Sequence, residues 1–131
     1  MGTITTFRDL DVYKKLCELH LDVCKLTMSF PKFELYELGS QIRRSSNSIP
    51  ANVAEGWNNR HINIYLECIN RAIGELQETE HHLYIAYRKE YLSEEKYENY
   101  SERYSECGKM LNGLYSSIQR SKKTRHLIPE T

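Results

Sequence analysis

Apolar side chains recur in this chain of 131 residues at alternating steps of four and three residues. In the N-terminal part the repeat passes through Val12, Leu16, Leu19, Val23 and Leu26. This spacing lines one face of an α-helix, whereas a β-strand would place apolar residues at every second position. Because such a stripe must be buried against another element, the repeat predicts helices that pack on one another.

Three later segments carry the same kind of repeat, and residues that interrupt helices separate them. Pro31 ends the first segment, and Gly56 with the Trp-Asn-Asn that follows it ends the second. We expect helices over about 9–28, 40–56, 62–90 and 93–119. The later apolar positions are Ile42, Ser46, Ile49 and Val53, then Tyr65, Ile69, Ala72, Leu76, Thr79, Leu83 and Ala86, and last Tyr97, Tyr100, Tyr104, Cys107, Leu111, Leu114 and Ile118.

Four amphipathic helices with short connections and no strand signal predict an all-α fold, an antiparallel up-down four-helix bundle. The chain is long enough to bury the core of one domain without metals or disulfides. We place this domain at residues 1–120 and expect residues 121–131 to form a basic, frayed tail.

Local features add detail to this bundle. Ser40 is a plausible N-cap of the second helix, and Pro50 inside that helix predicts a kink. Gly74 lies inside the third helix, where a glycine makes most sense if another helix comes close. The connection between the first two helices should pack across the end of the bundle through its apolar residues Phe33, Leu35, Tyr36 and Leu38.

The stretch from Gln41 to Gly56 has a polar face opposite its apolar one, which suggests that both faces are packed. Its side chains are of types that can form a defined hydrogen-bond network. The structural interpretation is that they pair with one another or with the third helix, and so fix helix register or the docking of subunits. The residues of this predicted network are Arg44, Ser48, Asn52, Glu55 and Glu75.

The alternative interpretation of this face is a ligand or RNA contact that uses Arg43, Arg44, Asn52 and Glu55. Arg43 lies at a different angle around the helix from Arg44, so it is the better candidate for an intersubunit or external contact. Under the structural interpretation, replacing Asn52 or Glu55 by alanine should disrupt folding or assembly, because buried partners would lose their hydrogen bonds.

Two segments, QIRRSSNSIPANVAEG at 41–56 and RAIGELQE at 71–78, resemble a bacterial family known as four helix bundle proteins. Its founding members are encoded in intervening sequences within 23S ribosomal RNA genes. The family pattern is roughly QxRRAxxSIxxNIAEG followed by a helix with an ELE-like segment, and the likeness covers about residues 7–120. The resemblance implies a four-helix protomer that assembles into a homopentamer around a central channel. A related branch, the accessory protein of diversity-generating retroelements, is strongly basic and binds nucleic acid and a reverse transcriptase.

The charges of the whole chain cancel, with 18 basic and 18 acidic residues. Any nucleic acid or anionic membrane would therefore need a local basic patch. The four cysteines are widely spaced inside helical segments, which favours free thiols in a cytoplasmic protein; they are Cys17, Cys24, Cys68 and Cys107. The sequence has no apolar run of membrane length, so we expect no membrane partner.

Patterns for catalysis or metal binding are weak. One Glu-x-x-His, from Glu78 to His81, supplies half of what a di-iron bundle requires on two helices. No serine lies in a nucleophile elbow and no glycine-rich phosphate loop is present. We therefore predict no catalytic residue, no metal, no cofactor and no small-molecule substrate, and hence a protein that is not an enzyme.

A basic run follows in the last part of the chain, which has no acidic residue between positions 109 and 125. Cations suit the C-terminal end of a helix, but five copies on one rim of a pentamer would also form a ring able to engage phosphates. The candidate nucleic-acid contacts are Lys109, Arg120, Lys122, Lys123 and Arg125.

The sequence thus predicts a cytoplasmic, non-enzymatic homo-oligomer that acts as a structural or adaptor module and could contact RNA or DNA. The alternative is a scaffold that binds only proteins. Salt distinguishes the two, because phosphate binding weakens steeply as salt rises and an apolar protein contact does not.

Overall fold

The computed structural model describes residues 2–127, with side chains described as far as residue 122, and its regular structure is helical throughout. Two short 3-10 helices, η1 (Phe7–Asp9) and η2 (Lys32–Glu34), accompany four α-helices. These are α1 (Asp11–Thr27), α2 (Leu38–Gly56), α3 (Ile62–Arg88) and α4 (Glu94–Leu127). The described residues contain no strand, which confirms the prediction of an all-α, four-helix fold.

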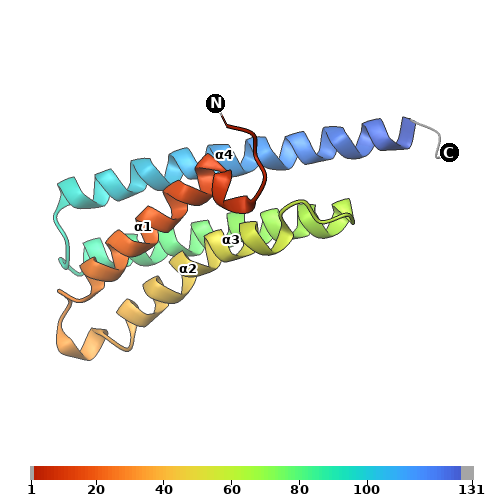
Figure 1. The fold of residues 1–131 in the computed structure, drawn as a ribbon. Coiled ribbons are helices and arrows are strands. Elements are labelled where there is room, and N and C mark those ends of the chain that lie inside the picture. Colours follow the sequence, from red (N-terminus) through yellow and green to blue (C-terminus); the bar gives the residue numbers. More distant parts are fainter. Residues whose placement is uncertain (1, 128–131) are drawn as a thin grey trace.

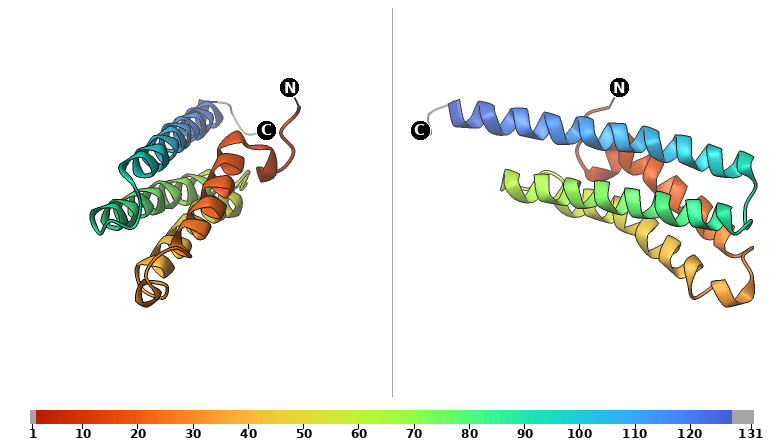
Figure 2. Two further views of the ribbon diagram at one scale, coloured as in Figure 1. Left: turned by 90° about the vertical axis from the view of Figure 1, so that its left-hand side faces the viewer. Right: turned by 180° about the vertical axis from the view of Figure 1, so that it is seen from behind.

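Consecutive helices run in opposite directions, and α4 returns to lie beside α1 (Figure 1). Among the described residues each helix contacts the two beside it, and the backbones of the diagonal pairs α1–α3 and α2–α4 stay farther apart. The contact between α1 and α4 is the least extensive of the four. The C-terminal end of α4 extends past the turn between α2 and α3 (Figure 2), so its last turns overhang the bundle.

The predicted apolar stripes form the core. Every predicted core position of α1 is buried, and Ile42, Ser46, Ile49 and Val53 of α2 are fully inaccessible. In α3 the stripe is buried from Ile69 onward. In α4 the buried positions of the stripe are Tyr104, Cys107, Leu111 and Ile118. Removing these side chains from water supplies the main driving force for the fold.

The helix ends follow the sequence in most places. Asp11 lies in the first turn of α1, and the Oγ of Ser93 accepts a hydrogen bond from the Lys96 amide at 3.2 Å at the start of α4. The expected N-cap of α2 is wrong, since the helix begins at Leu38, two residues before Ser40. Helix α4 continues to Leu127, beyond its expected end near position 119.

The expected close approach at Gly74 is also wrong. A Cβ atom added there would meet no atom within 4 Å, and the residue is exposed. The close contact lies instead at Gly56, where an added Cβ would fall 2.5 Å from the Cβ of Cys68. Helices α2 and α3 are therefore in close contact near the turn that joins them.

The connection between α1 and α2 is held by a carboxylate and by Phe30, which is buried with its ring centroid 5.1 Å from that of Tyr91. The buried Glu34 accepts hydrogen bonds from Lys89 Nζ at 2.8 Å and from the Tyr91 hydroxyl at 2.7 Å, both in the turn between α3 and α4. These bonds and the Lys89 charge lower the pKa of Glu34. Phe33 and Tyr36 were expected to pack across this end, but they are 71% and 82% exposed.

Candidate functional site

The polar face of α2 contacts α3 through one arginine. Arg44 pairs with Glu78, and its Nη1 atom lies 3.6 Å from the Oε2 of Glu75. That second distance is too long for a hydrogen bond, and Glu75 Oε2 is buried without a hydrogen-bond donor among the described residues. Glu78 also lies 3.6 Å from the Nε2 of His82. The cluster therefore links α2 to α3 by charge, with Glu78 as its central acceptor.

The other members of the predicted network do not join this cluster. Ser48 Oγ donates to the carbonyl of Arg44 at 3.0 Å, and Asn52 Nδ2 donates to the carbonyl of Ser48 at 2.8 Å. Both bonds stay within α2, and Glu55 is exposed. Within the protomer, replacing Asn52 or Glu55 by alanine would thus leave no buried partner without a hydrogen bond. The loss of buried hydrogen bonds therefore gives no reason to expect that either substitution disrupts folding of the protomer.

Arg43 is bound inside the protomer. Its Nη1 donates to the Oγ1 of the buried Thr27 at 2.9 Å, and its Nη2 donates to the carbonyl of Leu35 at 2.6 Å. The guanidinium thereby fastens the end of α1 and the start of α2 to each other. Arg43 is the predicted candidate for an intersubunit or external contact, and within the protomer both of its terminal nitrogens already have acceptors.

A cluster of His20, Cys24 and Ser46 lies between α1 and α2. His20 Nδ1 lies 2.7 Å from the Oγ of Ser46, and the Cys24 thiol lies 3.6 Å from His20 Nε2. Burial lowers the pKa of His20, which favours the neutral imidazole, and Ser46 is fully inaccessible. The sequence offered one signal for this cluster, a serine at a core position of the α2 stripe, but its histidine partner lies 26 residues away.

The thiols are not activated. Burial raises the pKa of Cys24 and of Cys68, and it raises the pKa of Cys107 to about 11, so these thiols stay protonated at neutral pH. Among the described residues no three His, Cys, Asp or Glu side chains are grouped so that they could hold a metal ion. No helix in this part of the chain is long and apolar enough to cross a membrane.

Large apolar side chains are exposed along α1 and the connection that follows it. Leu21 and Met28 are 61% and 66% exposed, and Phe33 and Tyr36 continue this exposed surface in the connection. Leu21 and Met28 are seven residues apart, so they lie on one face of α1, opposite the core stripe. We call Leu21, Met28, Phe33 and Tyr36 the apolar edge.

The predicted nucleic-acid contacts lie on α4. Lys109 and Arg120 are exposed, and Lys122 Nζ donates to the Asn63 side chain of α3 at 2.6 Å. The side chains of Lys123 and Arg125 lie outside the described residues. Lys109 and Arg120 are eleven residues apart, which places them on nearly the same outer face of the helix.

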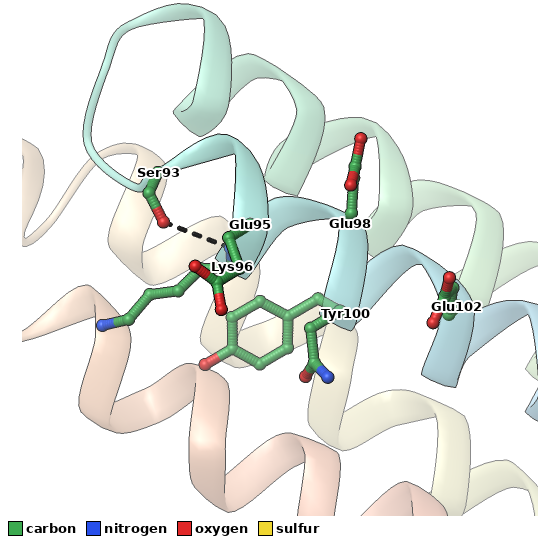
Figure 3. Close-up of a pocket in the computed structure, with 7 residues that line it drawn as sticks. Ser93, Glu95, Lys96, Glu98, Tyr100 and Glu102 are labelled. Atoms are coloured by element: carbon green, nitrogen blue, oxygen red, sulfur yellow. Dashed lines mark hydrogen bonds between the residues drawn. The ribbon is translucent and has the colours of Figure 1, made fainter.

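The other half of α4 is acidic. A groove of about 570 Å³ at its N-terminal end is lined by Glu95, Glu98, Glu102, Lys96 and Tyr100, among others. Figure 3 shows Glu98 and Glu102 projecting away from the ring of Tyr100, which points toward α1. Sequence reasoning did not single out these glutamates, although their spacing of three and four residues indicates one helix face.

These features define a four-helix bundle protein whose candidate sites are polar contacts between helices and exposed surfaces. The chain belongs to the 23S rRNA-intervening sequence protein family, whose model matches residues 8–113. The family resemblance stated from the two sequence segments is thereby confirmed.

One solved structure illustrates this relationship. The crystal structure of a protein with unknown function from the S23 ribosomal protein family of Bacteroides thetaiotaomicron is similar to this chain, with 29% sequence identity and a TM-score of 0.69. The match covers 79% of this chain and 97% of that protein. A comparison with curated proteins gives no match.

Proposed function

We propose that the protein is a non-enzymatic homo-oligomer that serves as a structural or adaptor module in the cytoplasm. The apolar edge carries this proposal, because its four large side chains are each more than half exposed in the protomer. A group of large exposed apolar side chains commonly marks a contact with another protein. The homopentamer implied by the family resemblance would cover such an edge.

The interior chemistry supports a role without catalysis. A nucleophilic thiol needs a depressed pKa, whereas burial raises the pKa of Cys24, Cys68 and Cys107. His20 and Ser46 form a close pair, but Ser46 has no accessible surface for a substrate to reach. The His20–Ser46 contact therefore acts between α1 and α2, as a link that holds the two helices in register.

Light scattering after size exclusion tests the proposal. The expected result is a mass of five protomers at about 1 M salt, because apolar contacts are not screened. The double variants Leu21→Gln/Met28→Gln and Phe33→Ser/Tyr36→Ser should lower that mass. The matched control is Ile64→Gln/Tyr84→Gln, which removes two exposed apolar side chains of α3, 44% and 41% exposed, and should leave it unchanged. A native chain that is monomeric at every concentration would contradict the proposal.

Nucleic-acid contact is the second candidate function, and the basic C-terminal half of α4 supports it. If phosphates bind there, affinity for a mixed RNA should fall steeply between about 50 mM and 200 mM salt. Lys109→Ala and Arg120→Ala should then weaken binding to all RNA sequences alike. An oligomer that does not bind RNA at low salt would favour the alternative, a scaffold that binds only proteins.

A further inference from the structure

Charge is segregated along α4 although the whole chain is neutral. Its N-terminal half carries five glutamates, and no acidic residue lies between positions 109 and 125. The exposed glutamates at steps of three and four residues form one outer stripe, and Lys109 and Arg120 continue that stripe toward the C-terminus. The stripe residues are Glu95, Glu98, Glu102, Glu106, Lys109 and Arg120.

The helix dipole does not account for this pattern. It favours acidic residues in the first turn and basic residues in the last turn, and its effect decays within one turn. Glu102 and Glu106 lie in the third and fourth turns of α4, and Lys109 lies near its middle. Of the outer glutamates, Glu106 pairs with Lys15 of α1 at 3.2 Å. The stripe therefore extends well beyond the region where intrahelical electrostatics would select its charges.

We propose that the outer face of α4 docks antiparallel against α4 of a second copy of this chain. In that arrangement the basic half of each helix lies over the groove of Glu95, Glu98 and Glu102 on the other, so both halves are paired at once. A parallel arrangement would set acidic residues against acidic residues. This inference deepens the proposed homo-oligomer and rests on it, since it names a surface between copies.

The shape of α4 permits this contact. The helix has 34 residues, a length of about 51 Å, and its C-terminal end overhangs the bundle. Midway along the basic half, Gly113 faces open space, with no atom within 4 Å of an added Cβ. A neighbouring helix can thus approach without displacing side chains of this protomer.

An antiparallel helix pair has two-fold symmetry, so it doubles whatever assembly the other surfaces form. A pentamer built through the apolar edge would become a pair of pentamers joined by α4 contacts. A second copy also fits the whole stripe better than RNA does. A phosphate backbone laid along α4 would be attracted by the basic half and repelled by the glutamate half.

Light scattering at two salt concentrations tests the pairing. At about 0.1 M salt the native protein should show twice the mass that it shows at about 1 M, where the screening length falls from about 10 Å to about 3 Å. Two variants, Glu95→Lys/Glu98→Lys/Glu102→Lys and Lys109→Glu/Arg120→Glu, should each lose the doubling. An equal mixture of the two should regain it, because one then has a stripe that is basic except for Glu106 and the other has an all-acidic stripe.

The matched control for the triple variant is Glu18→Lys/Glu37→Lys/Glu67→Lys. It makes the same change in net charge at exposed positions away from α4 and should keep the doubling. Orientation is tested with cysteines. Glu95→Cys mixed with Arg120→Cys should give an oxidised mixed dimer, whereas neither variant alone should cross-link to itself through the new cysteine. Self-cross-linking at both positions would indicate parallel helices and overturn the inference.

The outcomes distinguish this inference from the proposed function. If the salt-resistant oligomer forms but never doubles, the α4 contact is wrong and the homo-oligomer stands. If doubling survives charge reversal, charge complementarity does not cause it and the inference is likewise overturned. If the native protein fails to double at low salt and binds RNA there, the stripe is a nucleic-acid surface. A protein monomeric in all conditions overturns both.

Discussion

Among the described residues, Glu34 is the only charged residue that is buried. Its carboxylate joins the two turns at one end of the bundle, because Lys89 and Tyr91 both donate to it from the turn between α3 and α4. A buried carboxylate without such donors would be strongly destabilising. These donors come from positions 55 and 57 residues away, so no local sequence pattern indicates them.

Glu34→Gln should lower the free energy of unfolding at neutral pH by about 1–2 kcal/mol, because Lys89 loses the opposite charge of its partner and the hydrogen bond from Tyr91 becomes a neutral one. The pKa of Glu34 is lower in the folded state than in the unfolded chain. Its stabilisation is therefore present above the unfolded-state pKa and is lost as pH falls through the folded-state pKa. Urea unfolding from neutral to acid pH should show the difference between native protein and variant shrinking as the solution is acidified.

Glu37→Gln is the matched control for this measurement, since Glu37 is an exposed carboxylate in the same connection. Its free energy of unfolding should stay within about 0.5 kcal/mol of the native value. A Glu34→Gln difference that stays constant down to the lowest pH would show that lost packing, and not lost charge, causes the effect.

At the scale of helices, the hydrophobic periodicity predicted where the helices lie but not which residues are in contact between them. The steps of four and three residues identified four helices and most of their buried positions, because burying a stripe requires that spacing. The same pattern says nothing about where two helices are in close contact. Gly74 was expected at that point, but Gly56 occupies it, because the contact depends on the turn that joins α2 to α3. The partners of Arg43 and Arg44 likewise depend on the relative placement of helices.

The two glycines give opposite predictions for one substitution. Gly56→Ala places a Cβ 2.5 Å from the Cβ of Cys68, so it should destabilise the protein by about 1–3 kcal/mol. Gly74→Ala enters open space inside α3 and should stabilise it by up to about 1 kcal/mol. Thermal unfolding of both variants checks this pair. Equal shifts of the midpoint would contradict the α2–α3 geometry, since intrinsic helix propensity acts alike at both positions.

At the scale of the whole molecule, zero net charge conceals a separation of charge. Composition alone argued against a basic surface, and the basic run argued for one. The helical structure reconciles the two by placing the acidic and basic stripes on one face of α4. The basic run was visible in the sequence, but its relation to the glutamates became clear only when α4 proved to be continuous from Glu94 to Leu127.

Removing residues 121–131 should therefore weaken association between copies of the protein with little change in its stability. Among the described side chains of α4, which end at residue 122, the last buried one is Ile118. The truncation removes one described contact, the exposed bond from Lys122 to Asn63. Unfolding by urea at high salt should change by no more than about 0.5 kcal/mol, as for other exposed contacts. The deletion removes Lys122, Lys123 and Arg125, so the mass doubling at low salt should weaken. A loss of stability much larger than this would place residues beyond position 120 within the folded domain, because only core packing contributes that much.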